Sequence, residues 1–200
     1  MDNVLAKPAD LCCLKGAFHS GEATGSTIQI DGIDTYVAKP DPNRSNGNVL
    51  IFFPDAFGLH INSFLMMDAF AECGYLTLGV DYFLGDPVTK HSLTPLSDPN
   101  FDFESWKNKH LKASEEAAAR WVKAVKTQYG TSDDVKFACV GYWTIEILTE
   151  NNKKFNMQVF ANVGHGFASR ARLTDLYEKW AKEASFKSFV DWFDFWMDKK

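Results

Sequence analysis

Three apolar runs stand out along the chain, at residues 49–53, 75–81 and 135–140. Each is almost continuously hydrophobic, which is typical of strands that a parallel sheet buries on both faces. An amphipathic stretch at residues 62–73 lies between the first two runs and ends at Gly74, a residue suited to the left-handed turn after a helix. A strand, a helix and a second strand in this order predict a parallel pair joined by a right-handed crossover.

A hairpin precedes these runs. Residues 27–30 and 33–37 alternate in polarity around residues 31–32, an Asp-Gly pair that tolerates the positive φ angles of a tight turn. Residues 103–129 have helical periodicity, and Gly130 ends that helix. The order of elements predicts an α/β fold with a mostly parallel sheet and an N-terminal hairpin. The inner face of the long helix is expected to carry Ala117, Trp121, Ala124 and Val125.

The last part of the chain predicts a short helix at 145–151, a strand at 156–160, a loop at 163–168 and a long helix at 176–197. Thr174 is placed to cap the long helix. An apolar stripe on this helix is expected to pack on the sheet, and consists of Trp180, Phe186, Phe189, Val190, Phe193 and Met197.

Two stretches lack a strong periodic pattern. Residues 1–25 have the composition of an irregular leader, followed by a single domain at residues 26–200. The connection at residues 82–103 is long for a compact domain. It is either a lid over a functional site or a surface excursion that contains a short helix.

Composition narrows the class of protein. The chain has 200 residues, 46% of them apolar, with a net charge of −5 and no Lys/Arg run, so a nucleic-acid partner is not expected. It has no apolar segment that suits a signal peptide or a membrane span, and we expect a cytoplasmic protein with reduced thiols. Neither His60 and His91 nor the cysteines have the spacing of metal ligands, so no metal is expected. The cysteines are Cys12, Cys13, Cys73 and Cys139.

The third apolar run ends in part of a nucleophile motif. A strand that stops at a sharp turn with the pattern Gly-x-nucleophile-x-Gly places a Ser or Cys at the strand's carboxyl end. Gly141 and Tyr142 match the first two positions. Trp143 occupies the nucleophile position, and Ile145 occupies that of the second glycine.

Four segments together resemble the dienelactone hydrolase family, especially its fungal branch. They are residues 53–58 (Phe-Pro-Asp-Ala-Phe-Gly), 74–83, 140–142 (Val-Gly-Tyr) and 164–170 (Gly-His-Gly-Phe-Ala-Ser-Arg). The resemblance extends from about residue 26 to residue 200. It implies an α/β-hydrolase-like three-layer sandwich, a Cys-His-Asp triad and cofactor-free attack on a small ester or lactone.

The resemblance assigns roles to two residues of this chain, whereas the family's nucleophile and triad acid have no counterpart in it. His165 matches the family's catalytic histidine, and Asp55 stands where the family has a carboxylate that interacts with the resting nucleophile. Trp143 stands where the family has its cysteine, and no residue matches the triad acid.

The interval between the elbow and the histidine is too short for the whole fold. Only 22 positions separate Trp143 from His165, and their acids are Glu146 and Glu150 on the predicted helix. Since a βα unit takes about 30 residues, two missing units would remove roughly 60. We therefore expect a contiguous block to be absent near residues 143–144, a narrower sheet, and a marginally stable or self-associating protein.

Several candidate residues keep two interpretations. His165 is a catalytic base or an idle loop histidine, and Asp55 is a site carboxylate or a turn cap. Asp81 is expected to cap a turn. Ser169 and Arg170 bind a substrate carboxylate or form a solvated helix entry. Cys139, the cysteine nearest to the elbow, is expected to point into the core with a poorly ionised thiol.

Two classes of function follow. The first is a carboxylic-ester or lactone hydrolase of the dienelactone hydrolase type with an incomplete triad. The second is a catalytically inactive form that acts through association with another protein or with the complete form.

Overall fold

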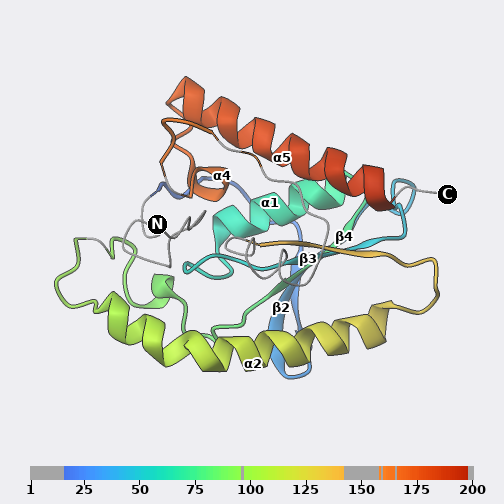
Figure 1. Ribbon diagram of the computed structural model, residues 1–200, viewed down its shortest axis with the longest axis horizontal. Helices are drawn as coiled ribbons and strands as arrows, with labels where there is room; N and C mark the ends of the chain where they lie inside the picture. Colours follow the sequence, from blue (N-terminus) through green and yellow to red (C-terminus); the bar gives the residue numbers. More distant parts are fainter. Residues whose placement is uncertain (1–15, 96, 142–157, 159, 165, 198–200) are drawn as a thin grey trace, which may run out of the picture.

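The structure is a computed structural model that describes residues 16–95, 97–141, 158, 160–164 and 166–197. Its centre is a five-stranded sheet with the strand order β1-β2-β4-β3-β5 (Figure 1). The last three strands of this order are parallel, and β1 and β2 join them antiparallel, as the apolar runs and the hairpin predict. The strands are β1 (Ser26–Ile30), β2 (Ile33–Ala38), β3 (Val49–Phe52), β4 (Leu76–Val80) and β5 (Phe137–Val140).

The turn of the hairpin has the predicted chemistry. Asp31 and Gly32 both have positive φ, at 52° and 70°. Two consecutive residues with positive φ match the right-handed twist of the flanking strands, which sets the register in which Ile30 pairs with Ile33.

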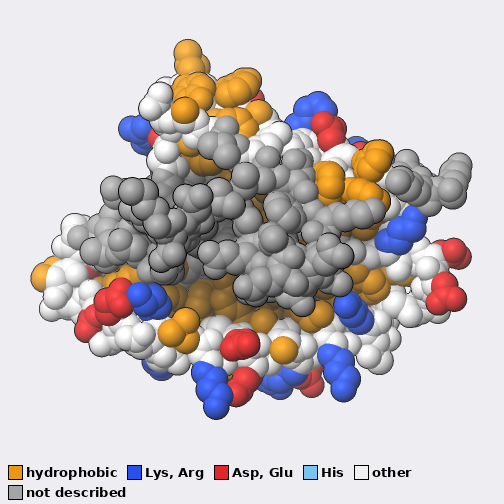
Figure 2. All heavy atoms as spheres, in the orientation of Figure 1, with side chains coloured by type: hydrophobic (Ala, Val, Ile, Leu, Met, Phe, Trp, Pro, Cys, Tyr) orange, Lys and Arg blue, Asp and Glu red, His pale blue; other side chains and the backbone are white. Residues whose placement is uncertain are grey.

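Helices cover both faces of the sheet, which gives three layers (Figure 1). On one face, α1 (Ile61–Glu72) and α5 (Leu176–Met197) bury a core that includes Phe52, Phe70 and Phe193. On the other face, α2 (Phe103–Tyr129) buries Ala117, Trp121 and Val125 against the strands, with Ala124 packed at the edge of this core. Charged side chains line the outer face of α2 (Figure 2), as its periodicity predicts.

The long C-terminal helix departs from the prediction at its first turns. Trp180 is 54% exposed, so it does not belong to the core stripe, whereas Phe193 and Met197 are buried. Apolar side chains gather on the surface at this end of α5 (Figure 2). The N-cap is Asp175 rather than Thr174, because Asp175 Oδ1 accepts hydrogen bonds from the backbone N–H groups of residues 177 (3.0 Å) and 178 (3.1 Å).

The connection between β4 and α2 contains a short 3₁₀ helix, η2 (Val88–Lys90), and is fastened to α2. The Asp86 carboxylate binds His91 Nε2 (2.6 Å), Lys109 Nζ (2.6 Å) and His110 Nε2 (2.9 Å). The hydrogen bond from Lys109, followed by those from the two histidines, holds the pKa of Asp86 well below its usual range. The connection therefore contains a short helix, as one of its two interpretations predicts, and Asp86 secures it to α2.

The structure tests the remaining expectations only within the residues that it describes. Residues 16–24 are irregular, as predicted, although several of their backbone groups bind α1 and the C-terminal part. The predicted helix at 145–151 lies outside the described residues, as does most of the strand predicted at 156–160. Of the loop predicted at 163–168, Phe167 and Ala168 instead begin the short helix α4 (Phe167–Arg170). Among the described helices, none has the length and apolarity needed to cross a bilayer.

Candidate functional site at the carboxyl edge of the sheet

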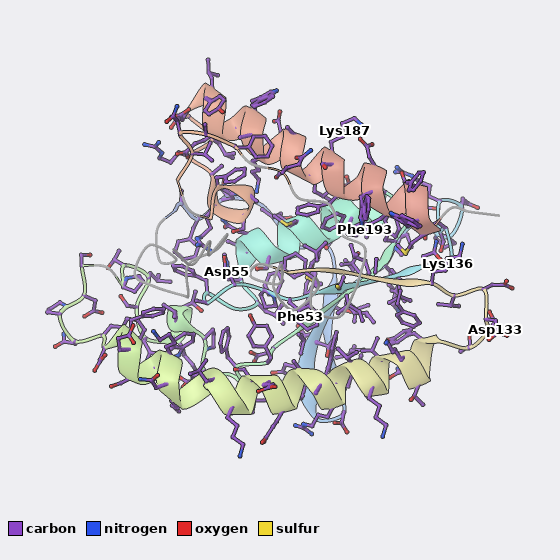
Figure 3. All side chains as sticks on the ribbon, in the orientation of Figure 1. Phe53, Asp55, Asp133, Lys136, Lys187 and Phe193 are labelled. Atoms are coloured by element: carbon purple, nitrogen blue, oxygen red, sulfur yellow. The ribbon has the colours of Figure 1, made fainter. Side chains whose placement is uncertain are left out.

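Asp55 lies just beyond the carboxyl end of β3, in the loop that leads to α1 (Figure 3). One carboxylate oxygen, Oδ1, accepts a hydrogen bond from the backbone N–H of Phe57 at 2.9 Å. The Gly58 N–H donates to the Asp55 carbonyl at 2.8 Å and closes the turn. Asp55 therefore caps its own loop with one oxygen, which leaves the other oxygen, Oδ2, for contacts across the site.

Oδ2 of Asp55 meets the segment that the sequence motif around residues 164–170 predicts to be functional. Ser169 Oγ lies 3.2 Å from it, and the Arg170 guanidinium forms an ion pair with it. The side chain of Arg170 is only 2% exposed and that of Asp55 only 11%. Residues 114 and 115 positions apart in the chain thus form one buried cluster, which we call the Asp55 cluster: Asp55, Ser169 and Arg170.

The burial of Ser169 and Arg170 excludes their interpretation as a solvated helix entry. Both lie on α4, whose N-cap is Gly166 with φ 81°. The guanidinium also lies over the Phe57 ring, with Cζ 4.4 Å from the ring centroid. A buried, desolvated Arg with a carboxylate on one side and an aromatic face on another is held in one orientation.

The other candidates nearby have different outcomes. Asp81 caps the turn after β4 as predicted, because its Oδ2 accepts the Gly85 N–H at 2.7 Å, and burial raises the pKa of its carboxyl. Cys139 is exposed, so the prediction that it points into the core is wrong: β5 is the edge strand of the described sheet. Desolvation nevertheless raises the pKa of the Cys139 thiol, which agrees with the expected poor ionisation. His165 and Trp143 lie outside the described residues.

His60 belongs to the same end of the sheet, and the sequence patterns predicted no role for it beyond excluding a metal ligand. It is the N-cap of α1, with Nδ1 accepting the Asn62 N–H at 3.4 Å, and its ring contacts those of Phe18 and Phe57. No described residue accepts a hydrogen bond from its buried Nε2. Burial, reinforced by His19, lowers the pKa of His60 to about 4. In the sequence, the one signal for this capping role was the position of His60 directly before the first helical residue.

This burial predicts a pH dependence of stability. Because the pKa of His60 falls from 6.5 to about 4 on folding, its contribution is fully present above pH 6.5 and is lost as the pH falls toward 4. We expect the loss to reach about 3 kcal/mol. Asn is a good N-cap without a titrating charge, so His60→Asn should flatten the dependence. Urea unfolding of both proteins between pH 7 and pH 4 measures it, and parallel curves would contradict this role of His60.

Metal chemistry receives no support from the part of the chain that the structure describes. Its His, Cys, Asp and Glu side chains nowhere converge in a group of three that could hold an ion. The chemistry available in the described part of the site is that of a carboxylate, a hydroxyl and a guanidinium.

A parallel-centred sheet, helices on both faces and a polar cluster at the carboxyl ends of the strands define an α/β protein of the kind that binds ligands at that edge. Within this class, residues 33–144 and 110–196 match the model of the dienelactone hydrolase family. The chain belongs to the dienelactone hydrolase family, and its sheet is a shortened α/β-hydrolase-type sheet.

The similar proteins are fungal. The chain is 78% identical to Dienlactone hydrolase 2 and 54% identical to Dienlactone hydrolase 1, both of Gibberella moniliformis, over all of this chain and 100% and 98% of those proteins. It is 27% identical to Hydrolase pyvD of Aspergillus violaceofuscus, over 96% of this chain and 98% of that protein. No solved structure matches.

The lengths of two alignments show that this chain lacks residues that its relatives have. The alignments with the two Gibberella proteins span 234 and 256 positions, whereas this chain has 200 residues. They therefore contain 34 and 56 positions at which this chain has no residue.

Proposed function

We propose that this chain retains the ligand-binding residues, the ligand-holding half, of a dienelactone hydrolase-type site for a small carboxylic ester or lactone. The other half would be the nucleophile and the triad acid. The observation that carries the proposal is the buried ion pair between Asp55 and Arg170 at the carboxyl edge of the sheet. The two residues come from two of the four segments that resemble the family, and the fold brings them into contact. His165, five positions before Arg170, is the fourth proposed member of the site.

We propose further that the chain binds such a ligand without forming an acyl-enzyme. The indole of Trp143, at the nucleophile position, cannot replace a thiolate. Cys139 is a poor substitute, because desolvation raises the pKa of its thiol and so lowers the fraction of thiolate. The 34 and 56 unmatched positions support the absence of residues from this chain. We propose that they form one block near residues 143–144, which carries the nucleophile and the triad acid.

Hydrolysis of 4-nitrophenyl acetate tests the missing nucleophile. We expect the wild-type chain, His165→Ala and Cys139→Ala to hydrolyse the ester at one common background rate, and intact-mass spectrometry to find no acetyl group on a cysteine. A lower rate in His165→Ala alone would show that the histidine still works as a base. A lower rate in Cys139→Ala alone would identify a substitute nucleophile.

Binding distinguishes this proposal from the second class of function. We expect dienelactone to raise the unfolding temperature of the wild-type chain, and to raise that of Arg170→Lys less, because Lys lacks the paired donors of a guanidinium.

A catalytically inactive form that acts through protein association is the second candidate. The exposed side chains of Leu176, Trp180 and Cys139 favour it. Absence of any stabilisation by the lactone, together with the common background rate, would leave only this candidate.

A further inference from the structure

The carbonyl end of α4 is held by donors from three distant parts of the chain. A helix of four residues cannot satisfy its last carbonyl groups internally, so they need partners from elsewhere. Every carbonyl from residue 168 to residue 171 has one. The donors are Lys182 Nζ to residues 168 (3.0 Å) and 169 (3.2 Å), Asn62 Nδ2 to 169 (3.0 Å), the Ala17 N–H to 170 (3.0 Å) and His19 Nε2 to 171 (2.9 Å).

Asn62 links two of these parts. It is the second residue of α1, is 1% exposed, and uses both ends of its amide. Its Nδ2 donates to the Ser169 carbonyl and to the Ala17 carbonyl (2.8 Å), and its Oδ1 accepts the His19 N–H (2.9 Å). One side chain thereby fixes the segment at residues 16–19 and α4 to the start of α1.

Lys182 approaches the same carbonyls from α5. Burial lowers the pKa of its ammonium to about 8, so it remains mostly protonated at pH 7 and keeps three N–H donors. A half-buried lysine that donates to the carbonyls of residues 168 and 169, next to Arg170, fixes the backbone from which the Arg170 side chain projects.

Gly16 lets the N-terminal segment lie directly against Arg170. Its φ is 131°, and a Cβ at this position would stand 2.4 Å from Arg170 Cβ. The requirement for glycine therefore has two sources, the backbone conformation and the close approach.

We propose that residues 16–19, Asn62 and Lys182 form a clamp that positions Arg170 against Asp55. Asn62 and Lys182 are positioning residues, since they act on the backbone of α4 and not on a ligand. The purpose of the clamp rests on the proposed function of the Asp55 cluster, whereas the clamp itself is measurable without any ligand or activity.

Modification of arginine by phenylglyoxal, mapped by peptide mass spectrometry, tests the clamp. Arg170 should be protected in the wild-type chain, while Arg120 and Arg172, which are more than half exposed, serve as internal references. Asn62→Asp keeps the shape of the side chain but removes the donor. We expect it to raise the modification rate of Arg170 relative to the references by about tenfold, because the Ala17 carbonyl loses this donor and the Ser169 carbonyl keeps only the hydrogen bond from Lys182.

Matched variants separate the clamp from general loosening. Lys182→Met should also expose Arg170, and Lys182→Arg, which keeps donors, should restore protection. Gly16→Ala should expose Arg170. Gly47→Ala also places a side chain at a positive φ, 74°, but it meets no atom within 4 Å and should leave Arg170 protected. Continued protection of Arg170 in Asn62→Asp and Gly16→Ala, or equal exposure in Gly47→Ala, would overturn the proposal. Binding or loss of the lactone plays no part in this readout, so its result stands apart from the fate of the proposed function.

Discussion

Replacing Arg170 with Met should lower the free energy of unfolding by about 3–5 kcal/mol, because the Asp55 carboxylate is then left buried without its counter-charge. The aliphatic part of Met fills the space of the arginine stem, so the effect reports mainly on the charge. Adding Asp55→Asn should recover much of the loss, since it removes the unpaired charge and keeps an oxygen for the Phe57 N–H. Urea unfolding of the two single variants and the double variant measures the coupling.

Arg120→Met is the matched control for this prediction. The side chains of Arg120 and Asp31 are 52% and 44% exposed, and Arg120 Nη1 lies 3.1 Å from Asp31 Oδ2. An exposed pair of this kind contributes at most about 1 kcal/mol. Equal and small losses in Arg170→Met and Arg120→Met would contradict a desolvated ion pair at the site.

Elements whose residues interact locally were predictable from the sequence. The Asp31–Gly32 turn, the three apolar strands and the long helices follow from patterns that repeat over a few residues, and the structure has them at nearly the same bounds. The exposure of Trp180 and the replacement of Thr174 by Asp175 as the N-cap show the limit of this reasoning. Periodicity identifies one face of a helix, but only the neighbouring elements decide how far along that face the core extends.

The site was predictable in its residues and not in its environment. Asp55, Ser169 and Arg170 were identified through the family motifs, and the structure brings them together. The burial of Ser169 and Arg170 was not predictable, because a Ser-Arg pair is typical of a protein surface. It results from contacts with residues 16–19, which are about 150 positions away, and with α5. The prediction that Cys139 points into the core was wrong for a similar reason. An apolar strand lies inside a sheet only when other strands cover both of its edges, and β5 is the edge strand of the described sheet.

Asn62 is the clearest example of a residue whose role the sequence patterns did not indicate. A polar residue at the start of an amphipathic helix reads as part of its cap. Nothing in the local sequence shows that its amide instead joins three segments. Its burial, at 1% exposed, is the structural signal that marks it.

The most direct test of the proposed function restores the segment that this chain is proposed to lack. The segment of Dienlactone hydrolase 2 that we propose to be missing near residues 143–144 would be grafted into this chain in place of Trp143 and Thr144. Because a nucleophile and an acid would then join Asp55 and His165, hydrolysis of 4-nitrophenyl acetate should rise by about 10²–10⁴-fold over the ungrafted chain. His165→Ala in the grafted chain should return the rate to background. A grafted chain that unfolds as cooperatively as the original and hydrolyses the ester no faster would contradict the claim that this chain retains the ligand-holding half of a dienelactone hydrolase site.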